Sequence, residues 1–356
     1  MTRRPIAWLL LLVLGACAGA PRTDTPTLPS ASPPAAPAPD RLPNVSLAPG
    51  WTPDSIAAQV ARFAAVELDF DESLLDAEGR ALVARLVEVS DILGEIFRRQ
   101  VWRSNPTYGE KLASAAGPGL DAAREYYTIM AGPWDRLEHD APFLDVGPKP
   151  PGAGLYPEDL TAAELNAWLE THPEARDEFT SYWTVIERAD PSGAADSLVA
   201  VPYSVAYRDE LERAATLLEE AAGHAANASL KSFLTARAES FRTNDYYASE
   251  VAWMELDGNL IEPTIGPYEV YEDGLMGWKA AFESFVGIKD PEASADLDTL
   301  VEHLPALEAA LPIEERYKSL DRSFGSPISV IDAIYTTGDA REGVQTLAYN
   351  LPNDPR

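Results

Sequence analysis

The chain has 356 residues and a formal net charge of −29 at pH 7, with 57 acidic against 28 basic side chains. A surface this acidic repels phosphate backbones and anionic lipid, which argues against nucleic-acid binding and against membrane attachment through surface charge. The single cysteine excludes an intramolecular disulfide and a cysteine-based metal cluster.

The first 17 residues have the pattern of a bacterial export signal. Thr2-Arg3-Arg4 gives a positive start, residues 6–14 are apolar, and small residues lead into Cys17. The apolar stretch is too short to cross a bilayer as a helix, which takes about 20 residues. The pattern resembles a lipobox, so we predict a signal peptide at 1–16, lipidation of Cys17, and a lipoprotein of the cell envelope. In a Gram-negative cell it would face the periplasm from the outer membrane. An ordinary signal peptide with an incidental cysteine is the alternative.

Residues 17–50 are rich in proline and alanine, with nine prolines between residues 18 and 50. This composition has too few apolar residues for a core and predicts a disordered linker after the lipidated cysteine. At about 3 Å per residue, such a linker would reach on the order of 100 Å from the membrane. The folded part is therefore predicted to begin near Trp51.

A helical region is predicted over residues 51–250. Apolar residues recur there at three- and four-residue spacing, and two helix-start signals, at Thr52 and at Thr161 with Glu164, precede periodic runs. A break rich in glycine and proline falls at 147–157. Beyond the helix that starts after Thr52, the predicted helices occupy residues 77–103, 121–130, 162–170, 204–223 and 226–248.

The composition changes in residues 251–356, which we predict to be a smaller, mixed α/β region. Short aromatic and β-branched segments bounded by glycine and proline predict strands, whereas 291–311 has helical spacing. Residues 278–288 fit either a helix or a strand. The fold class predicted for the whole chain is α+β, predominantly helical. The predicted strands lie at 259–264, 267–273, 326–336 and 343–350.

The familiar catalytic motifs are absent from the sequence. The four histidines (His139, His172, His224 and His303) are too far apart for two imidazoles to share one helix face, so no helix-borne zinc site is predicted. No glycine-rich phosphate loop and no Gly-x-Ser-x-Gly turn is present. We interpret each histidine as a surface or helix-end residue.

Residues 253–288 differ from the rest because they combine glycine, proline, tyrosine and paired acids. Glu262-Pro263-Thr264-Ile265-Gly266 is followed by Glu269-Val270-Tyr271-Glu272-Asp273 and then by a glycine- and phenylalanine-rich run from Gly277 to Val286. Near the end of the chain comes Asn350-Leu351-Pro352-Asn353-Asp354. In this order and spacing, the segments resemble the dipeptidyl-peptidase III family of zinc metallopeptidases, and its bacterial members in particular.

The resemblance implies an activity and a set of site residues. The family cleaves dipeptides from peptide N-termini, in a cleft between a lobe with a peptide-binding β-core and a helical lobe that carries zinc. Glu262 matches an acid of the peptide-binding lobe, where a carboxylate would suit a free ammonium group. Asn350 and Asn353 match asparagines that hydrogen-bond the substrate backbone. If these residues have no role in binding, Glu262 would be a solvated strand residue, and Asn350 and Asn353 would form a turn beside Pro352.

The sequence departs from the family pattern in two places. Where studied members have a tyrosine two residues after the acid, this chain has Thr264, so a phenol that could stabilise an oxyanion is missing there. The family's His-Glu-x-x-x-His helix and later glutamate ligand would follow the asparagine motif, and the chain has neither. We therefore expect the N-terminal part of a zinc-dependent dipeptidyl peptidase, inactive by itself. Zinc belongs to full-length family members, and no catalytic or metal residue is predicted here.

Two alternatives stay open at this stage. The chain could be a non-catalytic envelope lipoprotein that binds peptides, or an unrelated helical lipoprotein with a structural role. The second would be favoured if residues 253–288 formed one continuous helix. In the peptidase and peptide-binding interpretations the partners are peptides, with the membrane reached through the lipid anchor.

Overall fold

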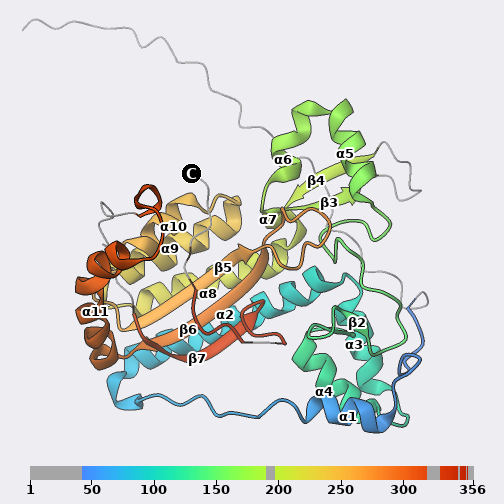
Figure 1. Ribbon diagram of the computed structural model, residues 1–356, viewed down its shortest axis with the longest axis horizontal. Helices are drawn as coiled ribbons and strands as arrows, with labels where there is room; N and C mark the ends of the chain where they lie inside the picture. The colour runs from blue at the N-terminus through green and yellow to red at the C-terminus, as the bar shows by residue number, and fades with distance from the viewer. Residues whose placement is uncertain (1–41, 190–196, 319–328, 344, 350, 352–356) are drawn as a thin grey trace, which may run out of the picture. The chain divides into compact units, whose positions relative to one another are not determined.

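The computed structural model describes residues 42–189, 197–318, 329–343, 345–349 and 351 (Figure 1). They form a predominantly helical α+β fold, as predicted. The signal peptide, Cys17, most of the predicted linker, Asn350 and Asn353 lie outside the described residues. Among the described residues, no helix has both the length and the apolar composition needed to span a membrane.

Residues 42–50 are packed, although the sequence placed them in the linker. Leu47 forms an isolated antiparallel bridge with Leu144, and the backbone N–H of Ala48 donates to the carbonyl of Phe143 at 3.0 Å. The Lys111 ammonium group also donates to the carbonyl of Pro43 at 2.7 Å. The linker prediction is wrong here because a few apolar side chains among the prolines find partners on the helices.

An aromatic cluster holds the first helices together. Helices α1 (Pro53–Val60), α3 (Asn105–Ser114) and α4 (Leu120–Met130) surround it, with a short hairpin of β1 (Trp134–Asp135) and β2 (Ala141–Pro142). The start of α1 follows from a capping box, in which Thr52 and Ser55 each accept a hydrogen bond from the backbone N–H of the other. The sequence analysis predicted α1 and α4 but not α3.

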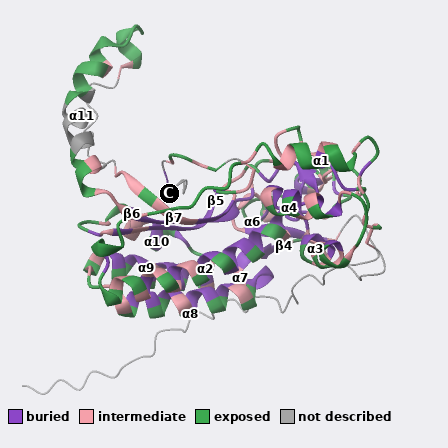
Figure 2. Ribbon diagram, turned by 90° about the horizontal axis from the view of Figure 1, so that it is seen from below, coloured by how far each residue is buried: buried purple, intermediate pink, exposed green. Residues whose placement is uncertain are grey.

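The longest helix, α2 (Ala77–Val101), begins where the Asp76 carboxylate accepts from the backbone N–H of Gly79 at 2.7 Å. It packs along α8 (Arg208–His224) and against the largest sheet, and α9 (Ala228–Thr243) packs beside α8 (Figures 1 and 2). Helix α10 (Tyr247–Met254) follows α9. The periodic apolar runs predicted at 77–103 and 204–223 correspond to α2 and α8.

A second small hairpin lies within the region predicted to be helical. Strands β3 (Thr184–Arg188) and β4 (Leu198–Pro202) pair antiparallel, so the description of residues 51–250 as purely helical is corrected. Helix α5 starts where the Thr161 hydroxyl accepts from the Glu164 N–H, as its capping signal predicted. The remaining short elements before the sheet are η2 (Glu72–Leu74), α5 (Ala162–Thr171), η3 (Pro173–Ala175), α6 (Arg176–Thr180) and α7 (Tyr203–Ala206).

The main sheet has three antiparallel strands in the order β5-β6-β7: Ile261–Glu269, Ala281–Lys289 and Ile331–Gly338. The ambiguous segment 278–288 is thus largely strand, and the two short strands predicted at 259–273 are one longer strand. Helix α11 (Pro291–Ala310) and η4 (Glu315–Tyr317) lie between β6 and β7 in the chain. Residues 345–349 are not in a strand, which corrects the prediction for 343–350. Because 253–288 contains two strands, it does not form the continuous helix that would have favoured an unrelated helical lipoprotein.

The sheet and the preceding helices share one hydrophobic core. Ile265, Val286 and Ile288 of the sheet belong to the same buried cluster as Leu86 and Leu93 of α2. The two regions on either side of residue 250 therefore share one core. Helix α2 also continues the sheet's hydrogen bonding, because the Gln100 amide accepts from the N–H of Phe282 at 2.8 Å and donates to the carbonyl of Ala280 at 3.3 Å.

Candidate functional site

The β5-β6-β7 sheet has two different faces because side chains alternate along each strand. One face packs on α2, where the hydroxyls of Ser284 and Ser90 lie 2.6 Å apart. The opposite face, which we call the outer face, carries the acid and the threonine of the motif. By register it comprises Glu262, Thr264 and Gly266 of β5, Glu283, Phe285, Gly287 and Lys289 of β6, and Thr336 and Gly338 of β7.

Glu262 lies at one end of the outer face. Its carboxylate accepts a hydrogen bond from the Asn259 amide at 2.6 Å and lies 3.0 Å from the Lys289 ammonium, which also donates to Asn259 at 3.0 Å. The Glu262 side chain is only 12% exposed. It is therefore not a solvated strand residue, which is what a residue without a binding role was expected to be. The three side chains form a closed polar triangle that holds the carboxylate in position.

A phenol reaches the centre of the outer face from the segment that follows β7. The Tyr349 hydroxyl lies 3.1 Å from the Thr264 hydroxyl, and its ring packs on Phe285 with centroids 4.3 Å apart. Burial raises the pKa of Tyr349 to about 12, against a smaller opposing effect of the Thr264 hydrogen bond. The phenol is therefore protonated at neutral pH and can donate. The site therefore has a phenol, from Tyr349, although residue 264 is a threonine. The sequence analysis did not identify Tyr349, which immediately precedes Asn350.

The other end of the outer face is acidic. Glu283 is 3% exposed, and burial, followed by repulsion from Asp339 and Glu269, raises its pKa to about 9. Burial also raises the pKa of Asp339 to about 7, helped by the charge of Glu272. Glu272 itself lies between Arg136 at 2.5 Å and Lys149 at 3.1 Å, and these cations outweigh burial and hold its pKa below the usual value.

These raised pKa values make the stability pH-dependent. Glu283 and Asp339 keep protons in the folded state that they lose in the unfolded state, so the stability that they contribute is lost between about pH 4 and 9. We expect the free energy of unfolding, measured by urea titration, to fall as the pH rises through this window, and Glu283→Gln to flatten the fall. Glu95→Gln, an exposed matched control, is expected to leave the slope unchanged. An identical slope in the Glu283→Gln variant would contradict the assignment.

Asp273, in the acidic turn of the motif, stabilises the connection between β5 and β6. Asp273 accepts hydrogen bonds from the backbone N–H groups of Leu275, Met276, Trp278 and Lys279, at 2.8–3.1 Å, and from the Tyr156 hydroxyl at 2.7 Å. The buried Lys279 ammonium donates to the carbonyls of Phe179 and Ser181 and to Thr184. Burial lowers the pKa of Lys279 to about 7. Together these contacts fix the connection between β5 and β6.

Gly266 of the motif makes room for a buried arginine. Arg237 of α9 is fully buried and donates to Glu250 at 2.5 Å and to the Tyr268 hydroxyl at 3.1 Å. A Cβ atom on Gly266 would lie 2.8 Å from the Arg237 Nη1 atom. The glycine therefore lets the guanidinium reach the edge strand that carries Glu262.

The histidines lie where the sequence placed them, at helix ends or on the surface. His172 is the C-cap of α5 and stacks on Trp168 at 4.1 Å, and His224 ends α8 and pairs with Glu78 at 2.8 Å. Within the part of the chain that the structure describes, no three His, Cys, Asp or Glu side chains are placed to hold a metal ion. These residues do not fit a zinc site.

The chain has a helical α+β fold with an acid-bearing sheet face. Residues 189–327 match Peptidase family M49. The chain is similar to the structure of dipeptidyl-peptidase III from Caldithrix abyssi, with 47% identity and a TM-score of 0.79 over 83% of this chain and 56% of that one. It is also similar to dipeptidyl-peptidase III from Corallococcus sp. strain EGB, with 41% identity and a TM-score of 0.76 over 88% of this chain and 56% of that one. The resemblance to the dipeptidyl-peptidase III family, predicted from the motifs, is confirmed.

A curated relative bears a different name. Nudix hydrolase 3 of Arabidopsis thaliana is 36% identical to this chain, over 85% of this chain and 45% of that protein. This chain thus spans about half the length of the relatives that it matches. The name describes the whole of that protein and is not transferred here.

Proposed function

We propose that this chain supplies the peptide-binding part of a dipeptidyl-peptidase III-like enzyme, which removes dipeptides from the N-termini of peptides. The observation that carries the proposal is the place of Glu262, held in a polar triangle at one end of the outer face. A largely buried carboxylate of this kind suits a peptide's terminal ammonium group. The family match supports the peptidase class of the whole enzyme.

The other residues of the outer face supply groups for a peptide backbone. The hydroxyls of Thr264 and Tyr349 offer donors and acceptors at its centre. By the family resemblance, Asn350 and Asn353 would hydrogen-bond the peptide backbone. Lys289 has a positioning role, because it holds the Glu262 carboxylate from the side.

In the proposed enzyme, zinc would be held by residues other than those that the structure describes. The described residues do not fit a metal site. We therefore assign them to binding and orientation of the peptide. We expect the purified chain to hold no stoichiometric zinc, measured by elemental mass spectrometry, and to release no dipeptide from peptides. Dipeptide release by the chain alone would contradict the assignment of the described residues to peptide binding only.

Peptide binding gives the direct test of the Glu262 assignment. We expect calorimetry to detect a tetrapeptide with a free N-terminus and to show that Glu262→Gln weakens it by about tenfold or more, since a charge-assisted contact contributes roughly 1.5–3 kcal/mol. N-acetylation of the peptide should have a similar effect, and the control Glu95→Gln should have none. Equal affinity for the free and acetylated peptides would overturn the role of Glu262. Peptide affinity in an intact gene product that never releases dipeptides would favour the non-catalytic alternative.

We also propose that the chain is exported and lipid-anchored through Cys17, on the evidence of the N-terminal pattern. Two acyl chains are needed for stable anchoring, because one chain alone binds weakly. In detergent phase separation the protein should partition into the detergent, and the Cys17→Ser variant should stay in the aqueous phase. A wild-type protein found only in the aqueous phase would overturn the anchor.

A further inference from the structure

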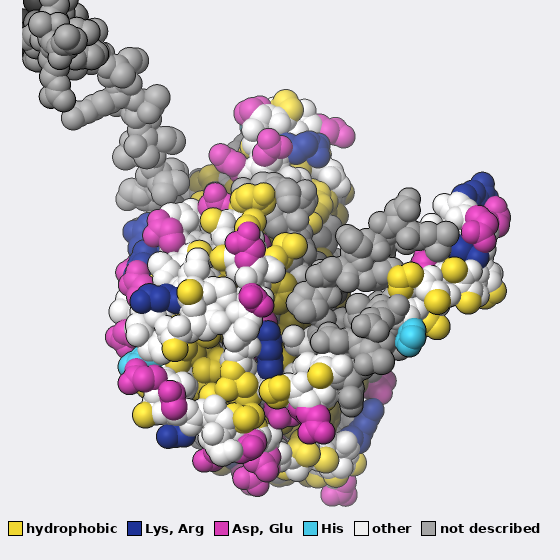
Figure 3. All heavy atoms as spheres, turned by 90° about the vertical axis from the view of Figure 1, so that its left-hand side faces the viewer, with side chains coloured by type: hydrophobic (Ala, Val, Ile, Leu, Met, Phe, Trp, Pro, Cys, Tyr) yellow, Lys and Arg dark blue, Asp and Glu magenta, His cyan; other side chains and the backbone are white. Residues whose placement is uncertain are grey.

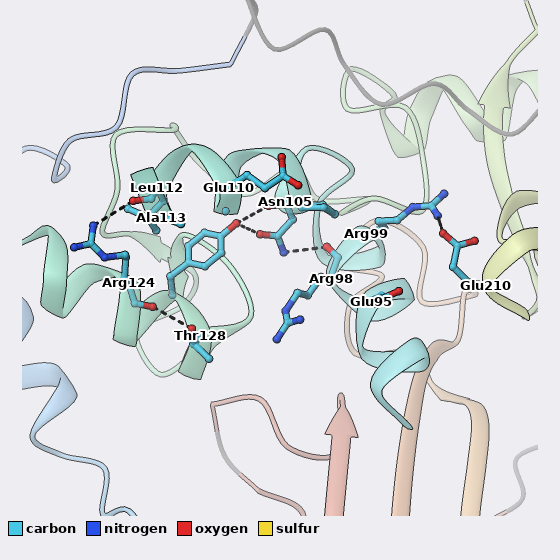
Figure 4. A pocket seen from close by; sticks show the side chains of 13 residues that line it. Glu95, Arg98, Arg99, Asn105, Glu110, Leu112, Ala113, Arg124, Thr128 and Glu210 are labelled. Carbon is cyan, nitrogen blue, oxygen red and sulfur yellow. Dashed lines mark hydrogen bonds and ion pairs between the residues drawn. The ribbon is translucent and has the colours of Figure 1, made fainter. Parts of the chain in front are cut away.

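A pocket of about 570 Å³ lies between helices α2, α3 and α4, with Glu210 of α8 on one side (Figure 4). None of the outer-face residues lines it. Its size lies within the range of small-molecule sites, roughly 300–1,000 Å³. The lining combines three arginines and three glutamates with one aromatic wall.

Two of the three arginines already have partners. Arg99 pairs with Glu210 at 2.5 Å and donates to the carbonyl of Ala206 at 3.3 Å. Arg124 donates to the carbonyls of Leu112 and Ala115, at 3.2 and 3.0 Å, and pairs with Asp121. Both guanidinium groups are therefore parts of the wall.

Arg98 is the exception. No residue in the described ranges forms a hydrogen bond or an ion pair with its guanidinium group, which projects away from those of Arg99 and Arg124 (Figure 4). Burial raises the pKa of the Tyr127 hydroxyl in the wall, and the charge of Arg98 offsets part of that rise, as it also does for Tyr335 and Glu342 outside the pocket. A guanidinium without a hydrogen-bond partner among the described residues can donate two parallel hydrogen bonds to a carboxylate.

The wall opposite Arg98 is rigid and partly apolar. Tyr127 is held by a hydrogen bond from its hydroxyl to the carbonyl of Asn105 at 2.8 Å. Gly109 lines the pocket next to that ring, and a Cβ atom on it would be 3.5 Å from the ring's Cε1 atom. Because residue 109 has no side chain, this part of the ring stays uncovered within the pocket.

The acidic residues around the pocket restrict the charge of a ligand. Glu95 and Glu110, both exposed, line it together with Arg98, so a dianion such as phosphate would be repelled more strongly than a single carboxylate. We infer that this pocket binds a small monocarboxylate with an aromatic or branched apolar body, with Arg98 on the carboxylate and Tyr127 against the body. This ligand site is independent of the proposed peptidase function.

The test compares a charged probe with its neutral isostere. We expect calorimetry to detect 3-phenylpropionate and to show weaker binding of 3-phenylpropanamide by about tenfold or more. Arg98→Gln should cause a similar loss, while the control Arg316→Gln, exposed on η4 and outside the lining, should not. Glu262→Gln should leave the affinity unchanged, which separates this pocket from the outer face.

A second variant tests the wall without touching a charge. Gly109→Leu should fill the space beside Tyr127 and abolish binding while keeping the melting temperature, because leucine has a higher helix propensity than glycine. Unchanged affinity in both Arg98→Gln and Gly109→Leu would overturn the inference. Tighter binding of inorganic phosphate than of 3-phenylpropionate would overturn the ligand class, and so would the absence of any binding.

Discussion

Replacing Arg237 by methionine is expected to destabilise the protein by about 3–5 kcal/mol, the usual effect of leaving a buried charge without its partner. Arg237 is fully buried, and the Glu250 side chain that it pairs with is only 6% exposed. Methionine has a similar length, so the loss comes from the unpaired Glu250 carboxylate more than from a cavity. Urea unfolding followed by circular dichroism measures the change.

Two controls make the Arg237 result specific. Arg242→Met, on the same helix, removes an arginine that binds Glu212 and Glu219 near the surface, and is expected to cost less than about 1 kcal/mol. The double variant Arg237→Met with Glu250→Gln should recover more than half of the loss, because it removes the uncompensated charge. A loss below about 1 kcal/mol in Arg237→Met would show that water reaches Glu250.

Asp273→Ala is expected to cost at least about 3 kcal/mol, because it leaves five hydrogen-bond donors without their acceptor. The connection between β5 and β6 depends on these bonds, so we also expect faster hydrogen exchange at the N–H groups of Trp278 and Lys279. Thermal and urea unfolding give the stability, and exchange mass spectrometry gives the local effect.

The Asp273 prediction also has graded controls. Tyr156→Phe removes only one of the five donors and should cost about 1–3 kcal/mol, less than the alanine variant. Asp257→Ala changes an exposed acid before the start of β5 and should stay within about 0.5 kcal/mol of wild type. If Asp273→Ala costs no more than Tyr156→Phe, the backbone donors find other acceptors and the turn is not fixed by this carboxylate.

The sequence predicted elements whose signal is local. The apolar stripes of α2 and α8 repeat at helical spacing over many residues, and the cap at Thr161 requires only the next turn of chain. The hairpin of β3 and β4 was missed because residues 51–250 were interpreted from their helical composition. Residues 345–349 have a strand-like composition but are not in a strand. Such a composition forms a strand only where a neighbouring strand completes its hydrogen bonds.

The site was predicted only in part, for a related reason. Glu262 could be identified because its motif is contiguous in the sequence. Its partner Lys289 comes from the next strand, and Tyr349 reaches Thr264 across 85 residues of chain. Such pairs depend on strand register and on the path of the chain after β7, which neither periodicity nor composition specifies. The raised pKa of Glu283 likewise depends on burial that only the packed sheet creates.

The Gln100 amide, which bonds to the backbone at the start of β6, limits how this sheet can be reused in protein engineering. A graft of residues 251–356 onto another scaffold would lose the acceptor for the Phe282 N–H and the donor for the Ala280 carbonyl. It would also lose the hydroxyl that faces Ser284. A transplantable binding module must therefore include α2, and a library designed to alter peptide preference should vary the outer face while leaving Ser90 and Gln100 unchanged.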